Sequence, residues 1–327
     1  MFLSLIKTFL VLISGTLSGY LFQKWSKKNQ WLNAEFLQKL AIFLQKLGMI
    51  WLMSITYIGS LWIFEIDSIT ELISLPFVGG LATIAGGLFA VLLANYLKYN
   101  RLDTGSIFSC GFFSNTVSLG GMICFFYLGE EGYALVPIYT FLIRLFYFGA
   151  GYPIARMYGS DNSSEENITK KLLAILKDPF FYIGVGAVLL GLLLNMSSLP
   201  RPKIYGYVNE MLIPISTFIL LFSVGLNLKL SRVNHYIKES LYLSAIKFLA
   251  VPLITLAIVL LLKYQSIGNG LPLKVSLIMS SMPVAFNSVI AANIYNLNVD
   301  LVNACWIFTT IGIIFVLPLL FFFINLF

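Results

Sequence analysis

Two interrupted apolar segments hold the residues of this chain best suited to bind a solute: residues 110–127 (CGFFSNTVSLGGMICFFY) and residues 280–295 (SSMPVAFNSVIAANIY). Small, polar or helix-breaking residues interrupt them: Asn115, Thr116, Gly120, Gly121, Pro283, Asn287 and Ser288. Because proline lacks an N–H and blocks the carbonyl one turn back, we expect a break near Pro283. In hydrocarbon, freed backbone groups persist only where protein or a water-filled cavity satisfies them. The segments therefore predict either a solute site or kinks packed against neighbouring helices.

The two segments occupy corresponding places in the two halves of the chain. A shift of 168 residues places Asn115 on Pro283 and Tyr127 on Tyr295. Each segment then continues through a short polar link into another apolar span. Paired interrupted spans are a sequence sign of a transporter binding site. The correspondence therefore favours a solute site.

The expected chemistry of this site is the binding of a small organic anion. Two broken helices that cross near the midplane would point their half-helix N-termini, each with roughly half a positive charge, towards one cavity. Such a place suits a carboxylate or another small anion. Four neutral side chains would orient the anion by hydrogen bonds: Asn115, Thr116, Asn287 and Ser288.

Two cations lie deep in predicted spans. Arg144 is near the middle of its span, where a charged side chain is a functional candidate by default. It could attract the anion, or it could neutralise a carboxylate or backbone carbonyls within the bundle. Lys247 lies about two turns from the inner end of its span and is expected to reach the interface in a structural role. Arg144 therefore joins the predicted site.

Enzyme chemistry finds little support. The single histidine, His235, lies in a basic loop, and the chain has neither the Cys/His spacing of a metal site nor a Gly-rich phosphate loop. We expect a protein that is not an enzyme and that carries no cofactor or metal. No Asp or Glu lies at the middle of a predicted span, so an obvious proton relay is missing. Sodium coupling and uniport driven by membrane potential both stay open.

The composition is that of a polytopic membrane protein. Of 327 residues, 59% are hydrophobic and 11% are charged, and the mean hydropathy is +0.89. The net charge of +7 does not predict a nucleic-acid partner, because the basic residues lie in short loops between apolar spans. The lipid bilayer is the expected partner of this surface.

Hydropathy predicts an all-α fold of ten transmembrane helices. The spans are 2–23, 40–63, 72–97, 105–128, 132–157, 180–196, 207–228, 239–263, 271–295 and 300–325. A polar connector at 158–178, which includes an expected amphipathic helix at 170–177, separates the repeats 1–157 and 179–327. Five spans in each half make this a 5+5 inverted repeat with broken, crossing helices 4 and 9.

Basic residues orient this topology. Fourteen Lys and Arg residues lie in or beside the loops after odd-numbered spans, and five lie on the other face. Because positive loops face the cytoplasm, we expect the connector inside and both termini outside a cell (inner) membrane.

The chain resembles the auxin efflux carrier family of membrane transporters. The strongest match is MPVAFNSVIAANIY, followed by Asp300 and the FTTIG and LPL runs between Phe308 and Leu319. The SNTVSLGGM and GEEGYAL runs of the first half and LFSVGLNL at 221–228 also agree. The first half departs where the family commonly has a proline, because Gly121 and Met122 stand there. The resemblance covers most of the chain, although spans one and two match only in hydropathy.

The resemblance implies further properties as expectations. Spans 1, 2, 6 and 7 would form a scaffold, and spans 3–5 and 8–10 would form a unit that moves like an elevator. The family also implies a homodimer and carboxylic-acid substrates such as auxin, malate or malonate. Asn115 and the segment from Pro283 to Asn287 would be the site.

Two other classes stay open. The bile acid:sodium symporter family has a similar layout, but its sodium site would need more acidic and amide ligands than the sequence offers. A non-transporting membrane receptor or assembly protein could also have inherited the fold, and a copurifying partner would distinguish it.

Overall fold

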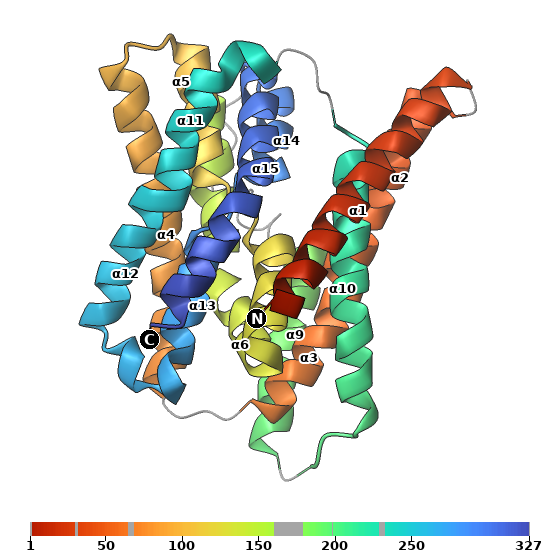
Figure 1. Cartoon of the computed structure of the whole chain (residues 1–327), viewed down its shortest axis with the longest axis vertical. Coiled ribbons are helices and arrows are strands. Elements are labelled where there is room, and N and C mark those ends of the chain that lie inside the picture. The colour runs from red at the N-terminus through yellow and green to blue at the C-terminus, as the bar shows by residue number, and fades with distance from the viewer. Residues whose placement is uncertain are drawn as a thin grey trace. The chain divides into compact units, whose positions relative to one another are not determined.

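A computed structural model describes residues 2–29, 32–64, 69–159, 179–197, 199–228 and 233–326. Within these ranges the chain is helical apart from its connections and one isolated β-bridge (Figure 1). Among the described residues, seven helices are long and apolar enough to cross a membrane, and residues 182–196 form a shorter apolar helix. The all-α membrane fold is thus confirmed. The ten-span inverted repeat stays a prediction, and the connector at 160–178 lies outside the described residues.

The chain divides into two compact units that each draw on both halves of the sequence. Unit 1 comprises Met1–Ile66, Val117–Pro137 and Lys177–Lys229, and unit 2 comprises Asp67–Thr116, Ile138–Leu176 and Leu230–Phe327. The predicted division into sequence repeats concerns internal symmetry, which this spatial division does not test.

Unit 1 is built on the pairing of α1 (Phe2–Lys28) with α10 (Ile204–Gly225). A Cβ on Gly19 would lie 2.2 Å from the Phe222 carbonyl oxygen, and one on Gly225 would lie 2.3 Å from the Thr16 oxygen. Small residues allow two helices to approach closely in a membrane, where the hydrophobic effect does not drive their association. Gln23 fastens the same pair by donating to the Leu226 carbonyl at 2.6 Å.

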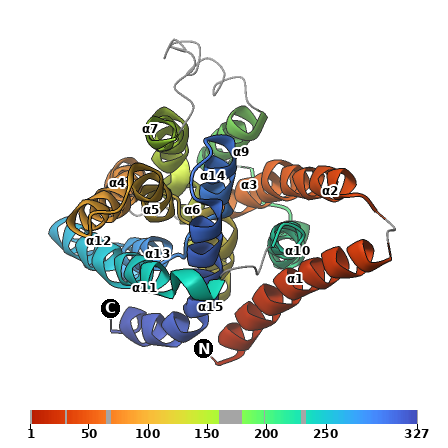
Figure 2. The same ribbon diagram turned by 90° about the horizontal axis from the view of Figure 1, so that it is seen from above.

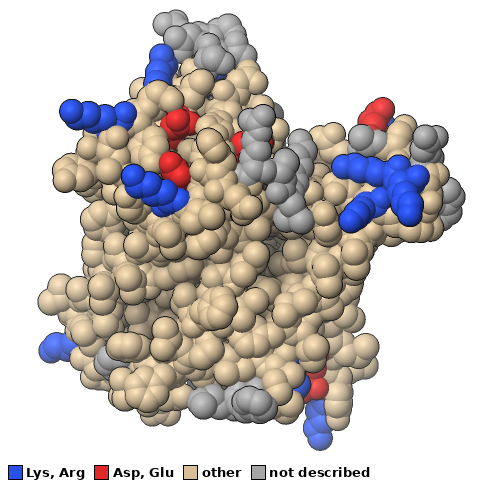
Figure 3. Space-filling model, turned by 45° about the horizontal axis from the view of Figure 1, so that its top comes forward, with Lys and Arg blue, Asp and Glu red and all other residues tan. Residues whose placement is uncertain are grey.

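The other helices of unit 1 pack against α10 or against one another. The helix α2 (Ala34–Lys46), the π-helical turn η1 (Leu47–Leu52) and α3 (Met53–Ile63) contact α10, and α9 (Pro179–Met196) packs against α3. The first part of α6 (Gly121–Phe146) also belongs to this unit. Figure 2 shows α1 and α2 on two sides of α10. The Asn195 amide caps the end of α3 by donating to the carbonyls of Leu61 and Phe64 at 3.0 and 2.7 Å. Lys27 and Lys28 lie in the last turn of α1. Figure 3 shows Lys and Arg gathered where α1 ends and α2 begins.

The close approach of α1 and α10 predicts that Gly19→Ala destabilises the protein. The added methyl group would collide with backbone, and such overpacking costs about 1–2 kcal/mol. We expect a lower melting temperature for the purified variant. Gly186→Ala in α9 is the matched control, because a Cβ there meets nothing within 4 Å. Equal melting temperatures for both variants would contradict this packing.

Unit 2 contains the remaining helices. In chain order these are α4 (Ile69–Tyr96), α5 (Arg101–Phe112), the later part of α6 (Gly121–Phe146), η3 (Tyr147–Gly151), α7 (Tyr152–Tyr158), η4 (Val233–Tyr236), α11 (Ile237–Ala245), η5 (Ile246–Ala250), α12 (Val251–Leu261), η6 (Tyr264–Ser266), η7 (Gly268–Gly270), α13 (Leu271–Ser280), α14 (Phe286–Ile294) and α15 (Val299–Ile324). Gly86 and Gly111 let α4 and α5 pack in close contact, because a Cβ on either would lie 2.4 Å from the other's carbonyl oxygen. Asn298 joins α15 to α5 by donating to Asp103 at 2.6 Å.

Candidate functional site

Two breaks in the helices of unit 2 satisfy each other's backbone. The first follows α5 at residues 113–115, and the second separates α13 from α14 at residues 281–285. Ser114 and Val284 form an antiparallel bridge, in which the Asn115 N–H donates to the Pro283 carbonyl at 2.9 Å and the Ala285 N–H donates to the Phe113 carbonyl at 3.1 Å. Because buried backbone groups need partners, each break makes the other tolerable in an apolar environment.

The sequence around Pro283 explains the second break. The residue before a proline is driven out of the helical conformation, so α13 cannot continue through Met282. Ser281 ends the helix by donating its hydroxyl to the Leu277 carbonyl at 2.8 Å. On the far side, Ala285 is extended and α14 begins at Phe286. Thr309 of α15 accepts the Val284 N–H at 3.2 Å, so a third helix also holds the break.

Two side chains of unit 2 hold the first break. The Tyr147 hydroxyl accepts the Ser114 N–H at 2.8 Å and donates to the Ser114 carbonyl at 3.0 Å. Lys247 places its ammonium Nζ 2.6 Å from the Gly111 carbonyl oxygen, 3.2 Å from that of Phe113 and 2.6 Å from the Ser114 hydroxyl. The prediction that Lys247 reaches the interface is therefore wrong: its side chain is only 1% exposed. The signal was a lone lysine within an apolar run, AIKFLAVP.

The predicted site residues of unit 2 divide into two groups. Asn115 and Pro283 meet through the backbone bridge, and Thr116 follows them as the first residue of the π-helical turn η2 (Thr116–Gly120). Asn287 and Ser288 lie in the first turn of α14. The Ser288 hydroxyl donates back to the Ala285 carbonyl, whereas none of the described residues hydrogen-bonds the half-buried Asn287 side chain. Asn287 is thus the member of this group with an amide available to a ligand.

Three predicted residues lie apart from the bridge. Gly120 ends η2 and Gly121 begins α6, and both belong to unit 1. Neither glycine lies in the break itself, which is earlier in the chain, at residues 113–115. Arg144 lies half-buried in α6, within unit 2. Among the described residues, no group of three or more His, Cys, Asp or Glu could hold a metal.

A polar network fastens the segment Val117–Pro137 into unit 1. Glu130 accepts from the Arg201 guanidinium, with one contact of 3.1 Å, and from the amide of the fully buried Asn209. Arg201 also donates to the Gly59 carbonyl at 3.0 Å, and the Asn209 amide donates to the Ser60 hydroxyl at 2.9 Å. This segment belongs to spans that the family resemblance assigns to the moving unit, and the observed units differ from that assignment.

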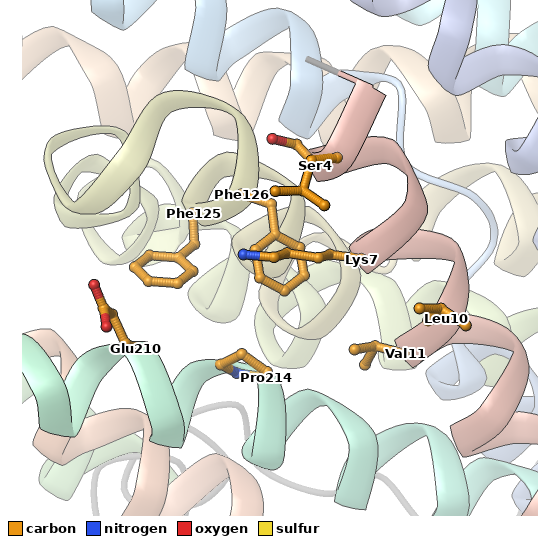
Figure 4. Close-up of a pocket in the computed structure, with 9 residues that line it drawn as sticks. Ser4, Lys7, Leu10, Val11, Phe125, Phe126, Glu210 and Pro214 are labelled. Atoms are coloured by element: carbon orange, nitrogen blue, oxygen red, sulfur yellow. The ribbon is translucent and has the colours of Figure 1, made fainter.

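Unit 1 also has a cavity of about 570 Å³ between α1, α6 and α10. Its lining consists of Leu3, Ser4, Lys7, Leu10, Val11, Phe125, Phe126, Glu210 and Pro214. Figure 4 shows Lys7 and Glu210 reaching towards the two phenylalanine rings from α1 and α10. None of these residues belongs to the predicted site, so this cavity is a separate feature.

Long apolar helices, together with two helix breaks held by buried polar groups, define an integral membrane protein of the transporter class. The chain belongs to the family described as Membrane transport protein, whose model matches residues 64–321. This match confirms the resemblance to the auxin efflux carrier family. Its start at residue 64 leaves out the first two predicted spans, which match the family only in hydropathy.

A relative from Methanothermobacter thermautotrophicus, described as an uncharacterized transporter, is 25% identical to this chain over 263 residues. The similarity covers 80% of this chain and 81% of the relative. A general transporter role is therefore supported by the family and by this relative together.

Proposed function

We propose that this protein is a secondary transporter that moves a small organic anion, a carboxylate, across the membrane by alternating access. The observation that carries the proposal is the paired break of unit 2, where α14 starts beside extended backbone. The N–H groups of Phe286 and Asn287 precede the first intrahelical hydrogen bonds of α14, whereas the Ser288 N–H donates to the Ala285 carbonyl at 3.1 Å. The N-terminus of α14 carries a partial positive charge of roughly half a unit. These groups suit a carboxylate.

The neighbouring side chains support the same ligand class. Asn287 offers amide N–H donors one residue into α14, and Asn115 lies half-buried beside the bridge. Neutral amides orient a carboxylate without binding it so tightly that release becomes slow. Arg144, which lies in the same unit, would add attraction for an anion.

The proposed movement follows from the same division of the chain. Unit 2 contains both breaks and most of the predicted site, and we propose that it carries the solute in an elevator-type movement while unit 1 serves as the scaffold. We also propose that the protein is a homodimer in a cell membrane, with both termini outside. Cross-linking in native membranes tests the dimer.

Cysteine labelling tests the topology. Ser163 lies in the predicted cytoplasmic connector and Ser266 in a predicted external loop. In intact cells, an impermeant thiol reagent should label Ser266→Cys but leave Ser163→Cys unlabelled until the membrane is opened. The native cysteines are buried, so the unmodified chain is the background control. The reverse pattern of labelling would overturn the orientation.

A thermal-shift screen tests the substrate class. Purified protein is melted with monocarboxylates, dicarboxylates, indole acids and bile acids, each in sodium and in potassium. A ligand at about 100 times its dissociation constant stabilises by about 2.7 kcal/mol. Stabilisation by a carboxylate in either salt, followed by its uptake into proteoliposomes, would support the proposal.

The same screen separates the alternatives. Stabilisation that needs sodium would favour a symporter of the bile acid:sodium type. A receptor or assembly protein would show no shift with any acid and would copurify with a partner.

A further inference from the structure

Lys247 occupies a site whose oxygen atoms would otherwise suit a small cation. Its three ammonium hydrogens match three acceptors, namely two backbone carbonyls and the Ser114 hydroxyl, at 2.6 to 3.2 Å. All three acceptors are neutral: the Gly111 carbonyl lies in the last turn of α5, and the other two groups lie in the first helix break. Uncharged carbonyl and hydroxyl oxygens are also the ligands by which unwound helices bind sodium.

The position of these oxygens explains why a cation belongs there. Gly111 lies in the last turn of α5, and Phe113 is the first residue after this helix. The last carbonyls of a helix lack intrahelical partners, and the helix C-terminus carries a partial negative charge. A carbonyl left without a partner inside an apolar bundle costs free energy. The Lys247 ammonium therefore neutralises the partial negative charge at the C-terminal end of α5.

The local backbone is adapted to deliver this side chain. Lys247 lies in η5, a π-helical turn, where the Val251 N–H donates to the Ile246 carbonyl. Such insertions are rare within helices and occur often at functional sites. A lysine stem is long and flexible, so it can bring a charge from η5 to the break after α5.

We propose that the Lys247 ammonium is a resident cation that occupies a monovalent-cation site in the helix break, so that the break of unit 2 needs no bound sodium. The inference rests on the proposed function only in naming this break as part of the solute site. Truncation of the side chain should expose the site to small cations, such as ammonium, ethylammonium or sodium.

Melting of purified variants in different salts tests this inference. Lys247→Ala is compared in choline chloride, sodium chloride, ammonium chloride and ethylammonium chloride at equal ionic strength. We expect it to melt below the unmodified protein in choline and to regain about 3 °C or more with at least one small cation. The unmodified protein should melt at one temperature in all four salts.

Two variants separate charge from packing. Lys247→Met keeps most of the side-chain volume but has no charge, so it should be destabilised and should not respond to the cations. Lys238→Ala removes an exposed lysine from the neighbouring helix α11 and should behave like the unmodified protein in every salt. A Met variant as stable as the unmodified protein would show that the charge is dispensable and would overturn the proposal.

Other outcomes are equally informative. A folded Lys247→Ala protein that no cation stabilises would overturn the inference. If this variant does not fold, the unmodified protein still tests the claim, because sodium-specific stabilisation of it would contradict a resident cation. None of these melting experiments contains an organic anion. A result that overturns the cation proposal therefore leaves the transport proposal untested and intact.

Discussion

Replacement of Asn287 by alanine should reduce transport by at least about tenfold, while the protein stays folded in the membrane. The amide lies in the first turn of α14, and no described residue hydrogen-bonds it. A hydrogen bond to a charged ligand contributes about 1.5–3 kcal/mol, and each 1.4 kcal/mol is about a factor of ten in affinity. Asn287→Asp should be more damaging, because a second negative charge would repel the anion.

Asn293→Ala is the matched control for this prediction. Asn293 is in the same helix, but its amide donates back to the Val289 carbonyl at 2.8 Å, so it is already used within α14. Uptake into proteoliposomes should therefore be close to the unmodified level for Asn293→Ala and low for Asn287→Ala. Equal, normal uptake by both would remove Asn287 from the site.

Replacement of Arg201 by alanine should destabilise unit 1 by about 3 kcal/mol, because Glu130 would lose its cationic partner. The side chains of Arg201 and Glu130 are only 11% and 23% exposed, so water replaces the lost contacts poorly. We expect the melting temperature of the purified protein to fall by several degrees, since each 1 kcal/mol corresponds to about 2–4 °C for domains of 150–250 residues.

A double variant tests the physical cause. Glu130→Gln removes the charge that Arg201→Ala leaves behind, so the pair of changes should be less destabilising than the sum of the two single changes. Lys203→Ala, an exposed lysine two residues away, is the control and should melt normally. Additive losses would show that Arg201 acts through packing and not through its ion pair with Glu130.

Local chemistry made the breaks predictable. Pro283 removes an N–H, and Asn115 lies in an apolar run, so both interruptions follow from properties that each segment carries in its own sequence. The exact start of the first break could not be read in the same way. Gly120 and Gly121 looked equally able to open that helix, but Tyr147 and Lys247 hold the chain open at Ser114 instead.

Tertiary contacts limited the rest of the prediction. Lys247 lies close enough to the end of its helix for its side chain to be expected at the membrane interface. Its exposure, however, depends on which helices surround it, and it is buried. The placement of Val117–Pro137 in unit 1 likewise depends on Arg201 and Asn209, which follow their partner Glu130 by 71 and 79 residues. Sequence spacing within one span carries no information on such distant partners.

The bridge between Ser114 and Val284 also constrains how the protein is made. About 170 residues separate its two sides, so ribosomes that add about 5–20 residues per second synthesise the first break roughly 10–30 seconds before its partner exists. Lys247 follows Phe113 by 134 residues and emerges earlier than Val284. The lysine can therefore shelter the first break during membrane insertion, before the second break arrives to complete the pairing. Completion of unit 2 is thus a late event, and a nascent chain that ends before residue 247 would lack the ammonium that the Gly111 and Phe113 carbonyls accept from.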